Sequence, residues 1–143
     1  MESSIVELSR YRYEASLEAL SDAKIMYKNG RYKNALNRSY YSIFHSIRAI
    51  NSLDGFDSSK HSGVIAHFNQ EYVKKGIFSK EASKLIKLAA ENREKADYLD
   101  FFVASKSEAE KQIERACRFN KMIKDYLVEE GILEPTQINE LNL

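Results

Sequence analysis

The sequence is poor in the residues that build cross-linked, metal-bound or loop-rich proteins. Its 143 residues include one Cys, one Pro, five Gly and no Trp. A lone thiol, Cys117, excludes a disulfide framework within the chain and a zinc site built on a cysteine cluster. Because no His is spaced to activate it, we expect Cys117 to be a small core residue of the last helix.

Long apolar runs and a large excess of one charge are also missing. No window approaches the roughly 18 consecutive apolar residues of a membrane span, and the first residues, Met-Glu-Ser-Ser, lack the basic-then-apolar order of a signal peptide. We therefore expect a cytoplasmic protein with no membrane partner. The 22 Lys and Arg residues nearly cancel the 21 Asp and Glu residues, which excludes a uniformly basic coat for nucleic acid.

The sequence is rich in helix-forming residues with regular apolar spacing. Few breakers among many Ala, Leu, Glu and Lys residues predict an all-α domain. The apolar periodicity and the short connections predict an up-down bundle of about five helices. The expected helices cover about residues 4–29 and 31–52, a shorter segment that ends before Gly76, a segment from Ser79 that fades near 97–100, and about residues 105–130.

The same spacing predicts which side of the first two helices is buried. Residues three or four positions apart lie on one face of a helix. The expected core residues are Leu8, Tyr11, Ala15, Ala19, Ala23 and Met26 in the first helix, and Leu36, Tyr40, Ile43, Ile47 and Ile50 in the second.

The last helix has clear start and stop signals. Ser105 and Glu108 form a capping-box pattern, in which each side chain satisfies a backbone amide of the other residue. After the stop, the chain becomes acidic and contains Pro135. We interpret residues 1–131 as one helical domain and residues 132–143 as an acidic tail, either a frayed end or a partner-binding peptide.

Charge is unevenly distributed along the chain. The stretch from Ala23 to Leu53 has six basic residues and no acid, whereas the residues after Lys124 include five acids and no base. The near-zero total is therefore a cancellation, and it permits one basic face that could attract an anionic partner.

The second helix concentrates functional residue types on the side opposite its core stripe. Asn34, Arg38, Tyr41, His45 and Arg48 lie within about 40° of one another at helical periodicity. The simplest interpretation is a solvated basic surface. Residues of these types on one surface also suit the binding of phosphate groups.

Arg38 and His45 form the chemically most informative pair. They are two helical turns apart, about 10.5 Å along the axis. The guanidinium is a permanent forked donor to phosphate oxygens, and the imidazole exchanges protons near neutral pH. The pair suits metal-independent RNA cleavage, in which a ribose 2′-OH attacks the adjacent phosphate.

Aromatic residues outside the core stripe leave two interpretations open. Tyr41 and Phe44 either pack against a second chain or cover neighbouring helices of the same chain.

Other candidate sites have ordinary structural interpretations. His61 and His67 neither share a helical face nor form an H-E-x-x-H motif, so we expect no metal site, and we expect His61 to be hydrogen-bonded near a helix start. Asp97 and Asp100 are typical turn and cap residues, and Arg93 is spaced to pair with Asp97. The absence of a Gly-rich phosphate loop excludes a P-loop, and we expect no cofactor.

Two blocks of sequence resemble a known family. The segment Ala35–His45 reads A-L-N-R-S-Y-Y-S-I-F-H and resembles the A-x-N-R-x-Y-Y-x-x-F-H segment of small stand-alone HEPN (higher eukaryotes and prokaryotes nucleotide-binding) domains. A second block begins with H-S-G-V-I at His61, continues to Arg93 and ends with A-D-Y at Tyr98, in the order found in that group. The similarity spans about residues 8–128.

The resemblance implies a helical bundle that forms homodimers and is often paired with a minimal nucleotidyltransferase in a toxin–antitoxin system. Many members are metal-independent ribonucleases with an R-x(4–6)-H motif, which Arg38 and His45 match with six intervening residues. These two are the expected catalytic residues, and RNA is the expected partner. The expected RNA or phosphate contacts are Arg31, Asn34, Ser39, Tyr41 and Arg48.

One departure from the family pattern separates two hypotheses. Catalytic members usually have Asn, Asp or His directly after the Arg, whereas this chain has Ser39, which holds no charge. The first hypothesis is a homodimeric, toxin-like endoribonuclease with a composite Arg/His site. The alternative is a catalytically inactive module that docks a nucleotidyltransferase or RNA.

Overall fold

The computed structural model describes residues 3–135 and confirms the all-α fold. No strand occurs between these residues. A short 3₁₀ helix, Ser52–Asp54, follows the second helix, and a short π-helix, Asn69–Val73, follows the third. The capping box is present, with Ser105 Oγ accepting from the Glu108 amide at 3.0 Å. The α-helices are α1 Ser3–Lys28, α2 Tyr32–Asn51, α3 His61–Phe68, α4 Lys80–Tyr98 and α5 Lys106–Glu129.

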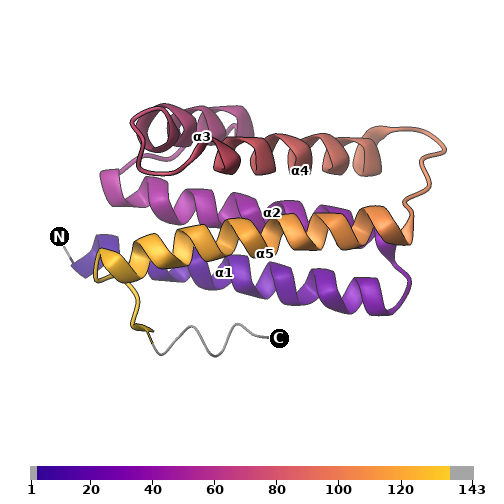
Figure 1. The fold of residues 1–143 in the computed structure, drawn as a ribbon, viewed down its shortest axis with the longest axis horizontal. Coiled ribbons are helices and arrows are strands. Elements are labelled where there is room, and N and C mark those ends of the chain that lie inside the picture. The colour runs from indigo at the N-terminus through magenta and orange to yellow at the C-terminus, as the bar shows by residue number, and fades with distance from the viewer. Residues whose placement is uncertain (1–2, 136–143) are drawn as a thin grey trace.

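The four long helices run up and down along one axis, and α3 and α4 follow one another along the same edge of the bundle (Figure 1). The central helix is α2, which packs against α1, α3, α4 and α5. Its predicted core stripe is confirmed, because Leu36, Tyr40, Ile43, Ile47 and Ile50 are each at most 1% exposed. With neighbours on most sides, α2 has only a narrow strip at the surface.

None of the helices between residues 3 and 135 combines the length and the apolar character that crossing a membrane requires.

The predicted core stripe of α1 is wrong in its first half. Leu8 and Tyr11 are 41% and 71% exposed, and the helix buries Ser9 and Ser16 instead. Ser9 Oγ donates a hydrogen bond to the Ala49 carbonyl of α2 at 2.9 Å. Small serines allow the two backbones to approach closely, and apolar periodicity does not detect a contact surface of this kind.

A chain of buried polar groups joins α1, α2 and α5. Ser42 Oγ donates to the Ser16 carbonyl oxygen at 2.7 Å and accepts from Asn120 Nδ2 at 2.8 Å. Asn120 Oδ1 in turn accepts from Ser46 Oγ at 2.7 Å. Because each side chain has its partners, their burial costs little and the network sets the register of the three helices.

The helical domain extends beyond the expected boundary at Gly131. This glycine has a φ of +74°, and the turn it makes directs Ile132 and Leu133 into the core, where they are 2% and 5% exposed. Arg10 Nε of α1 donates to the Ile132 carbonyl oxygen at 2.6 Å. The start of the predicted tail therefore belongs to the fold, while residues 136–143 lie outside the described residues.

Truncation of Asn120 tests the buried polar chain. Asn120→Ala leaves the Ser46 hydroxyl buried without its acceptor, so we expect the free energy of unfolding to fall by about 2–3 kcal/mol in urea titrations. The matched control is Asn92→Ala on α4, whose amide donates to the Leu88 carbonyl of its own helix. There we expect a loss below about 0.5 kcal/mol, and equal losses in the two variants would contradict the role of the network.

Candidate active site

The exposed strip of α2 brings together four of the predicted site residues. The Arg38 guanidinium lies over the Tyr41 ring, with Cζ 5.0 Å from the ring centroid. The Tyr41 and His45 ring centroids are 6.2 Å apart, and Arg48 follows within the next turn. All four side chains are partly exposed. We call Arg38, Tyr41, His45 and Arg48 the α2 face.

Arg38 is oriented by a relay that reaches α4. Asn37 Oδ1 accepts hydrogen bonds from Arg38 Nε and Nη2 at 3.0 and 2.8 Å. The Asn37 amide nitrogen donates to both carboxylate oxygens of Asp97, at 3.2 and 2.9 Å. This relay uses one edge of the guanidinium and holds its plane, so Arg38 Nη1 remains as a donor for an anionic ligand.

The surroundings of His45 favour its neutral form. Burial lowers the pKa of His45 below its ordinary value of 6.5, and the positive charges of Arg48, Arg38 and Arg12 lower it further. A neutral imidazole has one nitrogen that accepts a proton. At neutral pH, His45 is therefore in the form that a general base requires.

A second histidine borders the same face. The His61 ring stacks on Phe44 with centroids 4.1 Å apart and meets Tyr41 edge-on at 5.7 Å. His61 Nδ1 is 3.0 Å from Tyr40 Oη. His61, the first residue of α3, is thus hydrogen-bonded near a helix start as expected, and its partner is a side chain of α2. Phe44 is covered within the monomer by this stacking, as one of the two interpretations of the aromatic residues predicted.

Arg93 of α4 lies against Tyr41, the ring that contacts both histidines, and against Tyr40. Its guanidinium carbon lies 4.6 Å from the Tyr40 centroid and 5.6 Å from that of Tyr41. The predicted pair with Asp97 is present, with Nη1 to Oδ2 at 3.4 Å. Burial lowers the pKa of Arg93, but hydrogen bonds and the tyrosine and Asp97 neighbours outweigh it, so the pKa is raised overall and the charge is permanent.

Arg48 is anchored by a shared carboxylate. Asp57 Oδ2 accepts from Arg48 Nη2 at 3.0 Å and from Arg12 Nη2 at 3.2 Å. The hydrogen bond from Arg48 and the charges of both arginines hold the pKa of Asp57 below its ordinary value. Two guanidinium groups around one carboxylate keep this end of the α2 face positive although Arg48 has a partner.

Ser39 does not belong to the phosphate-contacting set in which the sequence placed it. Ser39 is fully buried, and its Oγ has no hydrogen-bond partner among the described residues. On α2 it lies one residue, about 100°, from Arg38, which turns it from the surface strip into the core. A phosphate at the α2 face cannot reach the Ser39 hydroxyl in this structure.

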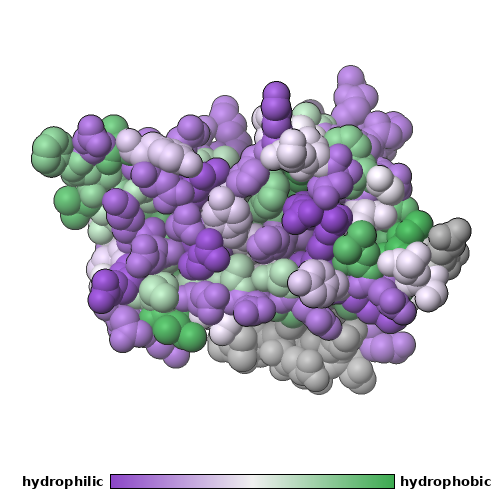
Figure 2. Space-filling view, turned by 180° about the vertical axis from the view of Figure 1, so that it is seen from behind, coloured by the Kyte–Doolittle hydropathy of each residue, from purple (hydrophilic) through white to green (hydrophobic). Residues whose placement is uncertain are grey.

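Arg31 and Asn34 lie toward the other end of α2. Arg31 precedes the helix, about 20 Å along the axis from His45. Both residues line a hollow with Phe102 and Val103 of the α4–α5 connection. Apolar side chains gather at that end of the molecule (Figure 2). Arg31 is therefore separated from the α2 face, whereas Asn34 lies one turn before Arg38 and borders it.

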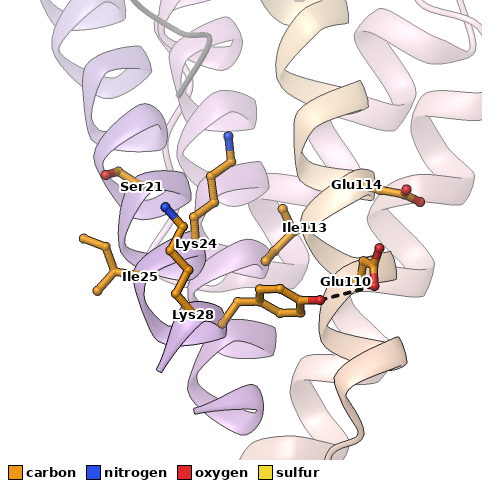
Figure 3. A pocket seen from close by; sticks show the side chains of 8 residues that line it. Ser21, Lys24, Ile25, Lys28, Glu110, Ile113 and Glu114 are labelled. Carbon is orange, nitrogen blue, oxygen red and sulfur yellow. Dashed lines mark hydrogen bonds between the residues drawn. The ribbon is translucent and has the colours of Figure 1, made fainter. Parts of the chain in front are cut away.

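The basic stretch from Ala23 to Leu53 does not form a single positive face. Lys24 and Lys28 line a separate groove of about 550 Å³ between α1 and α5, opposite Glu110 and Glu114 of α5 (Figure 3). None of the residues that line this groove belongs to the α2 face. The positive charge at the α2 face comes from Arg38 and Arg48 of that stretch, together with Arg12 of α1 and Arg93 of α4.

The remaining candidates, His67 and Cys117, have surroundings typical of residues with a structural role. His67 Nε2 is 2.8 Å from Asp54 Oδ2, and the ring stacks on Phe56 with centroids 3.8 Å apart. Cys117 packs against the core, and burial raises the pKa of its thiol. A thiol held in the protonated form is a poor nucleophile.

Comparison with known families decides where this arrangement belongs. The model of the HEPN domain matches residues 9–126. The chain belongs to the HEPN domain family. The Arg38 and His45 positions of its R-x(6)-H motif lie on the surface strip of α2, within the matched region.

Relatives of this HEPN protein have toxin names or names without an activity. It is 43% identical over 94 residues to a "UPF0332 protein" of Thermotoga maritima. The aligned region covers 66% of this chain and 69% of the relative. It is 36% identical over 116 residues to "Putative toxin MJ0605" of Methanocaldococcus jannaschii, covering 81% of this chain and 86% of the relative. A second protein of that organism, "Putative toxin MJ0142", is 32% identical over 121 residues, covering 85% and 80%.

Sequence reasoning missed four members of this HEPN site. Asn37, His61, Arg93 and Asp97 hold or border the α2 face, but their spacing along the chain gives no sign of it. The available signal was their presence in the two blocks of family resemblance. Residues of the two blocks thus meet in one side-chain cluster.

The lowered pKa of His45 predicts a pH dependence of stability. Between the folded pKa and 6.5 the unfolded chain binds more protons than the folded one, so stability rises with pH in that window. We expect the free energy of unfolding to fall as pH decreases through 6.5, and to fall less in His45→Gln. Urea titrations from neutral pH to about pH 5 measure the slope. An NMR titration of His45 with a midpoint above its ordinary pKa would contradict this account.

Substitution of Ser39 separates burial from function. Ser39→Ala removes an unpartnered buried hydroxyl, so we expect the free energy of unfolding to stay equal or to rise by about 1 kcal/mol. If the protein binds RNA, as the sequence predicts, Ser39→Ala should bind it with the affinity of the wild type in fluorescence anisotropy. Loss of affinity with unchanged stability would return Ser39 to the contact set.

Proposed function

We propose that this HEPN protein is a toxin-like, metal-independent endoribonuclease that acts as a homodimer. The observation that carries the proposal is the α2 face, where the neutral imidazole of His45 and the permanent, oriented charge of Arg38 both border Tyr41. The two relatives named as toxins support a toxin role. Following the family resemblance, a nucleotidyltransferase is the proposed antitoxin partner.

The chemistry requires a base, an acid and a cation. One His45 accepts the proton of the ribose 2′-OH while O2′ bonds to the adjacent phosphorus and the bond from phosphorus to O5′ breaks. Water supplies the proton to the leaving O5′, and the proton that His45 has accepted then passes to solvent. The products are a 2′,3′-cyclic phosphate and a 5′-hydroxyl. Arg38 stabilises the charge that develops on the non-bridging oxygens.

Variants of the α2 face test the nuclease. In EDTA, we expect purified wild-type protein to cleave single-stranded RNA, and His45→Ala and Arg38→Ala each to lose at least about 100-fold in rate, because each removes a group that acts in the transition state. The control is Lys33→Ala, an exposed lysine of α2 outside the α2 face. Equal rates for wild type and His45→Ala would remove the catalytic assignment.

The homodimer is tested with the same variants. If two α2 faces form one cleft, mixing unfolded Arg38→Ala and His45→Ala chains and refolding them together restores one complete set of groups in part of the dimers. Activity above that of either variant alone supports the composite site, and a monomer in light scattering contradicts it.

The alternative of an inactive binding module depended on Ser39. Because Ser39 is buried away from the α2 face, its lack of charge no longer favours that alternative. Wild-type protein that binds RNA or a nucleotidyltransferase from its own host, but cleaves no RNA, would establish it.

A further inference from the structure

The contacts of His61 determine which of its nitrogens carries the proton. Nδ1 lies 3.4 Å from Arg93 Nη2 and 3.0 Å from Tyr40 Oη. An arginine side chain has only donors, so Nδ1 is an acceptor. With Nδ1 as an acceptor, the Tyr40 hydroxyl is the donor in its contact with that nitrogen. A neutral His61 therefore carries its hydrogen on Nε2.

The groups around His61 oppose its protonation. Burial lowers its pKa below the ordinary value, and the charges of Arg93 and Arg48 lower it further. A proton on Nδ1 would also point at the Arg93 donor. The titratable and charged groups that face the ring are Tyr40, Tyr41, His45 and Arg48 from α2, Arg93 from α4, and Asp57 from the connection before α3.

His61 connects the α2 face to an adjacent hollow. It lines a surface hollow of about 580 Å³ with Phe44, Arg48 and Asp57. The His61 and His45 rings both border Tyr41 and Phe44, with centroids 4.1 to 6.4 Å from theirs. An RNA strand that passes from the α2 face into this hollow would therefore pass His61, which is partly exposed.

We propose that His61 is a second substrate-contacting residue, whose neutral Nε2–H donates a hydrogen bond to an RNA phosphate oxygen without transferring a proton. The proposal rests on the proposed function and adds a residue with a role different from that of His45. The two histidines of this surface therefore have different roles. His45 exchanges a proton, whereas His61 keeps its hydrogen and donates a hydrogen bond. A purely structural His61 would only support Phe44 and Tyr40.

NMR of the wild-type protein tests the tautomer directly and needs no activity. With ¹⁵N-labelled histidine, we expect the His61 signals of a neutral imidazole with the hydrogen on Nε2 at neutral pH, assigned by their disappearance in His61→Gln. A hydrogen on Nδ1, or a charged ring at neutral pH, would overturn the proposal.

Two substitutions divide the functions of the two nitrogens. His61→Asn places an amide near Nδ1 and retains the acceptor for Tyr40 and Arg93, but it lacks the outward donor. His61→Gln places its amide near Nε2 and retains the donor, but it loses the inner acceptor. If Nε2–H contacts RNA, we expect affinity for a non-cleavable 2′-O-methyl RNA to fall roughly 10- to 100-fold in His61→Asn and less than about threefold in His61→Gln. A structural role predicts the reverse order, and equal losses overturn the proposal.

The readouts separate this proposal from the proposed nuclease. A wild-type protein that binds the 2′-O-methyl RNA but cleaves no RNA contradicts the nuclease, while the order of the two variants still decides the role of His61. With cleavable RNA, His61→Asn should lower kcat/KM roughly 10- to 100-fold and keep the wild-type pH profile. An ionisation that disappears from the profile would show that His61 transfers a proton and would overturn the proposal. Thermal unfolding of both variants verifies that they fold.

Discussion

The burial of α2 is the constraint on which the rest of the structure depends. Four helices pack around it, and Ser42, Ser46 and Asn120 use their polar groups to bind it to α1 and α5 within the core. A helix enclosed in this way has few positions left for a ligand. The residues at those positions are partly buried and held by neighbours, so the arrangement that stabilises the fold also orients Arg38 and His45.

The site is assembled across the bundle rather than along one helix. Asp97 of α4 acts on Arg38 through Asn37, and Arg93 of α4 acts on His61 at the start of α3. Partial burial and nearby guanidinium groups lower the pKa of both histidines. A protein with a net charge of +1 can thus maintain neutral imidazoles in positive surroundings, because the arginines converge from α1, α2 and α4.

Apolar periodicity correctly predicted the helix faces that are buried through apolar side chains. The stripe from Leu36 to Ile50 and the capping box at Ser105 follow from local rules, and the structure has both. The prediction for α1 was wrong because its contact with α2 uses Ser9 and Ser16. The boundary at Gly131 placed the end of the domain too early, because a glycine turn can return the chain to the core as well as end it.

By itself, the sequence determined the all-α class, the helix limits and the placement of Arg38 and His45 on one face of α2, because these depend on spacing within one helix. The tertiary structure alone decided that Ser39 is buried, that Arg31 lies apart and that His61, Asn37 and Asp97 border the same face. Their contacts join residues more than 20 positions apart in the chain, and such contacts depend on how helices pack, which the period of a single helix does not contain.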